Sequence, residues 1–160
     1  MDDFYKNNPQ WLQQNIIDDT FLWEKSFTTT FDEFLNYVTF HDSFWIGSFI
    51  NQDMEYVCII RLDAFWNQKY SQSEKYDNEW HFCLVKIKNI ISFRIKKLDN
   101  DQTNTIGNCT TEIIDSTSIT QFDDVYGGHI EFTHKPQIKV LLITEQGEYL
   151  NPNPIICNEK

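Results

Sequence analysis

The sequence lacks the short motifs that mark the common catalytic and cofactor-binding sites. It contains no G-x-G-x-x-G, no P-loop, no G-x-S-x-G and no H-E-x-x-H. These patterns arrange groups around a phosphate, a nucleophile or a zinc ion. Their absence argues against dinucleotide-binding, nucleotide-hydrolysing, serine-hydrolase and zinc-protease classes. We therefore expect a binding protein rather than an enzyme, with no cofactor and no metal.

Paired cysteines and long apolar runs are missing as well. Cys58, Cys83, Cys109 and Cys157 show no C-x-x-C spacing, which disfavours zinc ribbons and thioredoxin-like motifs. Cys58 and Cys83 lie in apolar stretches and are expected to be small buried side chains. No apolar run approaches the roughly 20 residues that a bilayer requires. The acidic first residues do not resemble a secretory signal, so the expected location is the cytoplasm, without a membrane partner.

Basic residues are scarce relative to acidic ones. Lys and Arg total 13 and Asp and Glu total 24, which gives a net charge of −11. Such a charge repels nucleic acid and attracts basic partners. Only residues 56–100 are net basic, with 8 bases against 5 acids. Lys86 and Lys88 alternate there with apolar residues, which is typical of the solvent face of a half-buried strand rather than of a nucleic-acid patch.

Apolar and aromatic residues are plentiful. They account for 41% and 16% of the 160 residues, respectively. A disordered acidic tail would be poor in both. A chain of this length suits a single domain over residues 1–160, large enough to bury roughly 70% of the surface that its unfolded chain exposes.

Two helices are expected near the start of the sequence. Asn8-Pro9 is typical of a helix N-terminus, and apolar residues follow it at helical spacing. Thr30-Phe31-Asp32-Glu33 matches a capping box, in which a hydroxyl and a Glu each satisfy a free backbone amide. Phe31, Phe34, Leu35 and Val38 then fall on one helical face, which predicts a helix from Phe31 to about Val38.

Strand-like segments dominate the rest of the chain. They cover residues 44–49, 55–62, 80–95, 112–122, 128–132 and 138–143, with a bend or bulge expected at Asn89 and loops at 67–78 and 98–108. Short connections without intervening helices favour antiparallel pairing. The predicted fold is therefore α+β, a mainly antiparallel sheet of about six or seven strands with one or two N-terminal helices packed on it.

Histidines next to acidic residues are the best candidates for chemistry. His41-Asp42 lies between the second helix and the first strand, where Asp42 could orient the imidazole or hydrogen-bond the backbone of a tight turn. His129 and Glu131, two residues apart, could share a strand face and hold a metal. A small-ligand- or metal-binding domain that uses His41, Asp42 or His129 is therefore the alternative to a protein-binding role.

A resemblance to a known family comes from the order of several segments. Phe40-His41-Asp42-Ser43 precedes the strand-like segment 56–62, and 82–93 and 128–132 follow. In residues 30–145 this order resembles small bacterial immunity proteins of polymorphic-toxin systems, which often carry a His-Asp pair shortly before a hairpin. The resemblance implies a cytosolic protein that binds a cognate toxin domain and blocks it. Contact-dependent growth inhibition is one setting for such pairs.

Acidic residues beside aromatic ones are the candidates for that contact. A toxin that acts on nucleic acid, such as a nuclease, presents a basic cleft, toward which an acidic inhibitor is steered. Buried aromatics supply the strongest contacts of many interfaces. Three groups in predicted loops and turns combine both features: Asp63 with Phe65 and Trp66, Asp77 and Glu79 with Tyr76 and Trp80, and Asp123 and Asp124 with Tyr126. We expect these residues to bind the partner by covering its basic surface.

Overall fold

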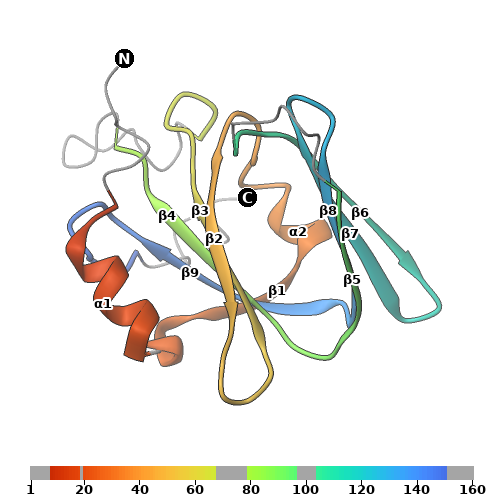
Figure 1. Ribbon diagram of the computed structural model, residues 1–160, viewed down its shortest axis with the longest axis horizontal. Coiled ribbons are helices and arrows are strands. Elements are labelled where there is room, and N and C mark those ends of the chain that lie inside the picture. Colours follow the sequence, from red (N-terminus) through yellow and green to blue (C-terminus); the bar gives the residue numbers. More distant parts are fainter. Residues whose placement is uncertain (1–7, 19, 68–78, 97–103, 151–160) are drawn as a thin grey trace, which may run out of the picture.

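The computed structural model describes residues 8–18, 20–67, 79–96 and 104–150, which form two β-sheets and few helices (Figure 1). The helical elements are α1 (Gln10–Asp18), the 3-10 turn η2 (Trp23–Lys25) and α2 (Phe31–Phe34). The strands are β1 (Phe27–Thr30), β2 (Phe44–Ile50), β3 (Tyr56–Arg61), β4 (Phe82–Ile87), β5 (Ile90–Lys96), β6 (Ile106–Ile114), β7 (Thr117–Asp124), β8 (His129–His134) and β9 (Gln137–Ile143).

The strands divide into a five-stranded sheet, in the order β1-β9-β4-β3-β2, and a four-stranded sheet, in the order β5-β8-β7-β6. Every pairing of named strands is antiparallel. The mainly antiparallel architecture agrees with the sequence prediction. The prediction of one sheet with about six or seven strands is wrong, because two sheets face one another across a shared core.

Two bent segments connect the sheets at one corner. β4 continues into β5 through Lys88-Asn89, and β8 continues into β9 through Lys135-Pro136. The two segments pair with each other on both sides of the bend, since β4 pairs with β9 and β5 with β8. Asn89 has a φ of 56°, and a bulge follows at the start of β5. The predicted bend at Asn89 is thus confirmed, and it is the place where strands pass from one sheet to the other.

A second connection between the sheets lies at the first residue of β2, far from the two bends. Phe44 forms an isolated antiparallel bridge with Thr105. Around it, the amides of Asp42 and Trp45 donate to the carbonyls of Ile106 and Asn104, each at 2.8 Å. These bonds fix the start of β6 against the start of β2.

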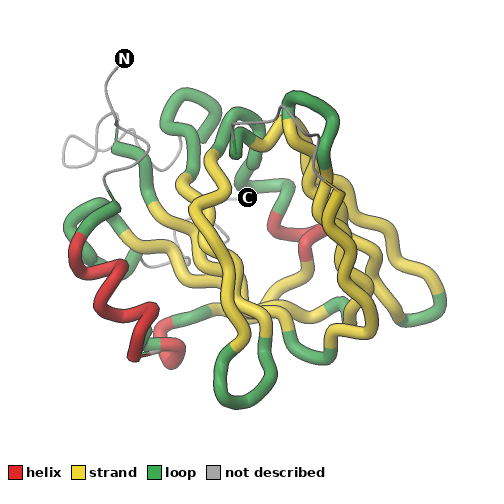
Figure 2. The backbone as a smooth tube through the Cα atoms, viewed as in Figure 1, coloured by secondary structure: helices red, strands yellow, loops and turns green. Residues whose placement is uncertain are grey.

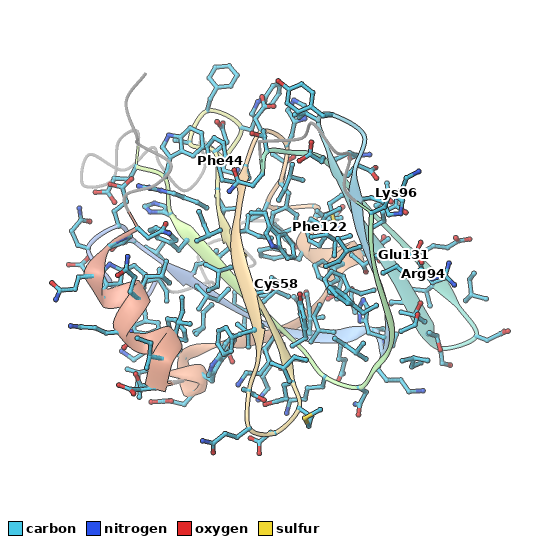
Figure 3. All side chains as sticks on the ribbon, in the orientation of Figure 1. Phe44, Cys58, Arg94, Lys96, Phe122 and Glu131 are labelled. Carbon is cyan, nitrogen blue, oxygen red and sulfur yellow. The ribbon has the colours of Figure 1, made fainter. Side chains whose placement is uncertain are left out.

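Aromatic side chains fill the space between the sheets. Phe122 of β7 and Phe132 of β8 contact each other and Trp45 of β2. Phe31 of α2 adds an edge contact to Phe122, with ring centroids 6.0 Å apart. In Figure 3, Phe122 lies between the two sheets. Such close-packed rings supply the apolar burial that stabilises the domain.

Helix α2 is shorter than predicted. The Thr30 hydroxyl accepts a hydrogen bond from the Glu33 amide at 3.1 Å, as the capping box requires. The Glu33 carboxylate accepts from Thr29 rather than from the Thr30 amide. The α-helix ends at Phe34, and a turn replaces the remaining residues to 37.

The outer face of the five-stranded sheet is covered by α1 and the segment after it. Leu12 of α1 and Phe21 are buried with Phe82, Leu84 and residues of β3 and β9 in a second apolar cluster. The helix is held in place because the Trp11 indole donates to the Glu145 carbonyl at 2.8 Å. The expectation of an N-terminal helix packed on the sheet is met by α1, whereas α2 belongs to the core between the sheets.

Candidate functional site

Loops from three parts of the sequence meet at one end of the two sheets. They are the turn before β2, the loop after β3 and the β7–β8 turn, which Figure 2 shows together at the top of the molecule. We call the surface formed by His41, Asp42, Phe65, Trp66 and residues 123–126 the loop end. Phe65, Trp66 and Tyr126 are 68%, 48% and 61% exposed. Large aromatic side chains that remain this exposed are typical of binding surfaces.

A hydrogen-bonded cluster forms one half of the loop end. The Trp66 indole donates to Asp42 Oδ2 at 3.0 Å, and the same oxygen lies 3.5 Å from His41 Nε2. The His41 and Trp66 rings meet edge to face, with centroids 4.8 Å apart. His41 Nδ1 lies 2.8 Å from the Gly107 carbonyl oxygen, which can only accept, so this nitrogen carries a proton.

Asp42 occupies a left-handed conformation, with a φ of 60°. Asp tolerates this region better than most residues, which suits it to the tight turn that precedes β2. Its amide donates to the Ile106 carbonyl and its carboxylate accepts from Trp66. The tight turn is confirmed, but the expected bond of the Asp42 side chain to the backbone is wrong, because the carboxylate accepts from the Trp66 indole instead.

The other half of the loop end is the acidic turn between β7 and β8. The Asp124 carboxylate accepts from the Tyr126 amide at 2.7 Å, and Gly127 closes the turn with a φ of 99°. Asp123 accepts from the Gln121 side chain. Both acids are partly exposed. The Val125 amide donates to the Thr105 carbonyl, which attaches the turn to the start of β6.

The strand β6 brings the two halves together. His41 and Asp42 bond the carbonyls of Gly107 and Ile106, while Val125 bonds the neighbouring Thr105. The predicted groups around Trp66 and around Asp123, Asp124 and Tyr126 therefore belong to one surface. Beside Trp66, a depression of about 450 Å³ is lined by residues 35–39 and 65–67.

Of the remaining predicted acids, the structure describes Asp63 and Glu79, and neither is an exposed acid of the loop end. Asp63 is only 7% exposed, so the expectation of an exposed acid is wrong there. Its carboxylate accepts from the Trp66 amide at 2.9 Å and its own amide donates to the Ser43 hydroxyl, so it shapes the loop. Glu79 is largely buried, with Oε2 3.8 Å from His81 Nδ1. Tyr76 and Asp77 lie outside the described residues.

His129 lines a separate cavity of about 100 Å³ between the sheets. Its walls include Trp45, Ile95, Ile106, Phe122 and Ile130, and Lys96, Asp123 and Asp124 also border it. Within the described residues, no group of three or more His, Cys, Asp or Glu is arranged to hold a metal ion. His41 and Asp42 lie in the loop end and not at this cavity.

The sequence prediction included Phe65 and missed Val125; both are exposed apolar side chains of the loop end. The signal available for Val125 was its position between Asp124 and Tyr126. The sequence prediction assigned His41 and Asp42 to a possible chemical site, and the structure places them beside Trp66.

In comparisons with known proteins, no family model, no curated protein and no solved structure matches this chain. None of the helices in the described ranges is long and apolar enough to cross a membrane.

Proposed function

We propose that this chain is an immunity protein that binds a cognate toxin domain, a nuclease being one such toxin, and neutralises it by covering its basic surface. The observation that carries the proposal is the gathering of Asp42, Asp123 and Asp124 with exposed Trp66 and Tyr126 at the loop end. Carboxylates there attract Lys and Arg of the partner, and the aromatics exclude water from the contact.

The fixed geometry of these groups supports a binding role. Trp66 is held by its hydrogen bond to Asp42 and by the ring of His41, and Tyr126 lies in a hydrogen-bonded turn. A surface that is ordered before binding loses less conformational entropy when the partner arrives. The depression beside Trp66 offers space for a side chain of the partner.

The net charge of −11 supports fast association with a basic partner. Oppositely charged surfaces steer encounter, and association rates then fall steeply as salt is added. An inhibitor of an intracellular toxin benefits from such speed, because protection depends on capture before damage accumulates.

The experiment is co-expression and co-purification of this chain with the product of the adjacent upstream reading frame. A stable complex that protects growing cells from that product is the expected result. Failure of the chain both to bind the product and to protect the cells would contradict the proposal.

Binding of a small apolar ligand is a second candidate, favoured by the cavity beside His129. Its volume of about 100 Å³ is below the roughly 150 Å³ of a cavity that holds benzene, so it suits only a very small group. Incubation with short-chain alcohols or carboxylates should then raise the melting temperature, and no change with any of them would remove this candidate.

A further inference from the structure

Strand β5 is an exposed edge of the four-stranded sheet. Among the strands that the structure describes, it pairs only with β8. Six of its seven residues are exposed. An edge strand presents unpaired backbone N–H and C=O groups to any extended chain that can lie beside it. β5 is therefore a template for strand addition.

One face of β5 carries positive charge. Arg94 and Lys96 alternate along the strand with apolar residues, and Figure 3 shows them projecting away from the space between the sheets. Arg94 lies opposite Glu131 in the register, and Lys96 lies opposite His129. Across the described part of the chain, neither cation comes within 4.0 Å of a carboxylate. Two such cations are notable in a protein with a net charge of −11.

The other face of β5 is apolar. Phe93 lies opposite the fully buried Phe132, so it faces the interior side, and it packs on Phe132 and Tyr56 with centroids 5.2 and 5.1 Å away. It nevertheless remains 39% exposed, and Ile95 is 61% exposed. Ile95 also borders the cavity of about 100 Å³ that reaches Trp45 of β2. A cavity of this size suits one aliphatic side chain.

We propose that β5 accepts an extended segment of a protein partner in which acidic and aliphatic residues alternate. Main-chain hydrogen bonds to β5 would supply affinity, and alternate side chains would supply specificity. The acidic residues would lie beside Arg94 and Lys96, and the aliphatic ones over Phe93 and Ile95, with one side chain in the cavity. The proposal does not rest on the function proposed for the loop end, although Asp123 and Asp124 of that surface also border the cavity.

Charge complementarity selects this partner over a second copy of the chain. Pairing β5 with β5 would place Arg94 and Lys96 of two copies on one face and bring together two molecules of net charge −11. A strand that carries carboxylates on that face is attracted to both cations instead. Charged side chains and bulges can protect a sheet edge. The bulge of β5 lies between Ile90 and Ser92, and residues 93–96 keep a regular register with β8.

The test uses two synthetic peptides of about eight residues, one alternating valine with glutamate and one alternating valine with lysine. Binding to the full-length protein is measured by fluorescence anisotropy, and amide hydrogen exchange locates the contact. The overall negative charge of the protein favours the lysine peptide, so a preference for the glutamate peptide reports the local charge of β5.

We expect the glutamate peptide to bind about tenfold more tightly and to slow exchange of the β5 amides that do not bond β8. Arg94→Glu with Lys96→Glu should reverse the preference. Lys25→Glu with Lys135→Glu, which changes two other exposed cations by the same charge, should leave it intact. Equal or tighter binding of the lysine peptide, protection confined to other strands, or dimerisation through β5 without peptide binding would overturn the proposal.

Discussion

The Trp66 indole donates a hydrogen bond to the Asp42 carboxylate at 3.0 Å, across 24 residues of sequence. This bond ties the loop after β3 to the turn before β2. Because it holds an indole that is still about half exposed, Trp66 is presented to solvent in one orientation. A preorganised aromatic ring is well suited to anchor a protein partner.

Replacing Trp66 with Ala should weaken binding of the co-purified toxin partner at least tenfold, since anchoring aromatics often contribute about 2 kcal/mol or more. Trp66→Phe should retain more affinity, because it keeps an aromatic ring while losing the indole N–H that bonds Asp42. The matched control is Ile113→Ala, which truncates an apolar side chain on β6 that is 52% exposed. Equal losses for Trp66→Ala and the control in a titration would remove Trp66 as an anchor.

Removing the Glu145 side chain should destabilise the fold. Glu145 Oε1 lies 2.7 Å from Nη2 of Arg61, whose side chain is only 7% exposed, and it accepts from the Trp80 amide. Glu145→Ala removes one carboxylate partner of a buried cation and the acceptor of the Trp80 amide, so it should lower the free energy of unfolding by about 2–4 kcal/mol. Glu145→Gln keeps an oxygen acceptor and should cost less. Urea unfolding measures both, and two similar small losses would contradict the role of the ion pair.

The three described cysteines should be unreactive in the native protein. Cys58, Cys83 and Cys109 are free thiols, and burial raises the pKa of each well above its ordinary value. Thiolates are the reactive form, so a Cys157→Ser variant should not react with a thiol reagent at pH 8 until urea unfolds it. Rapid labelling of the folded variant would show that these strands open readily.

Stability should fall when the pH drops below about 6.5 because of His134. His134 is fully buried; its Nε2 lies 2.9 Å from the Thr120 hydroxyl and its Nδ1 faces the Lys135 carbonyl. Burial outweighs that carbonyl and lowers the pKa of the imidazole. The unfolded chain therefore binds the proton first as pH falls, and the stabilising effect of neutral His134 is present above the unfolded pKa and lost below it.

Urea unfolding between pH 7 and pH 5 measures this effect in the wild type and in His134→Gln. The wild type should lose up to about 1.4 kcal/mol per pH unit more than the variant, which is less stable overall but lacks this titration. Glu55 does not affect this comparison between pH 7 and pH 5. Its pKa lies below its ordinary value, so its contribution to stability is lost only at lower pH. Parallel pH profiles for the two proteins would contradict the assignment.

Local sequence signals predicted much of the fold. The bend at Asn89 and the Thr30 N-cap were readable because each depends on a few adjacent residues. The β6–β7 turn was missed because Asp115 and Ser116 adopt positive φ angles without a glycine, so the predicted strand 112–122 runs through it. The first residues of β6, 106–108, were wrongly assigned to a loop. The division into two sheets was missed because it depends on which distant strands pair.

The sequence predicted which types of residue form the candidate site but not how those residues are arranged. An acid beside an aromatic was visible at Asp124 and Tyr126, but the same pattern at Asp63 describes a buried turn residue. Nothing local links Asp42 to Trp66, since the chain between them forms a hairpin first. Exposure and long-range contact are properties of the folded chain, which limits what residue patterns alone can locate.

The most direct test of the account is the association rate with the toxin partner after charge is removed from the loop end. Asp42→Asn, Asp123→Asn and Asp124→Asn together remove three negative charges and keep an oxygen acceptor for each existing hydrogen bond. Glu24→Gln, Asp53→Asn and Glu112→Gln form the control, because they remove the same charge from exposed positions on other elements.

Stopped-flow mixing at low and high salt gives the decisive comparison. The loop-end variant should associate about tenfold more slowly at low salt and lose most of its salt dependence, whereas the control should stay close to the wild type. Equal slowing of the two variants would mean that only net charge matters. That result would contradict a partner-binding surface at the loop end.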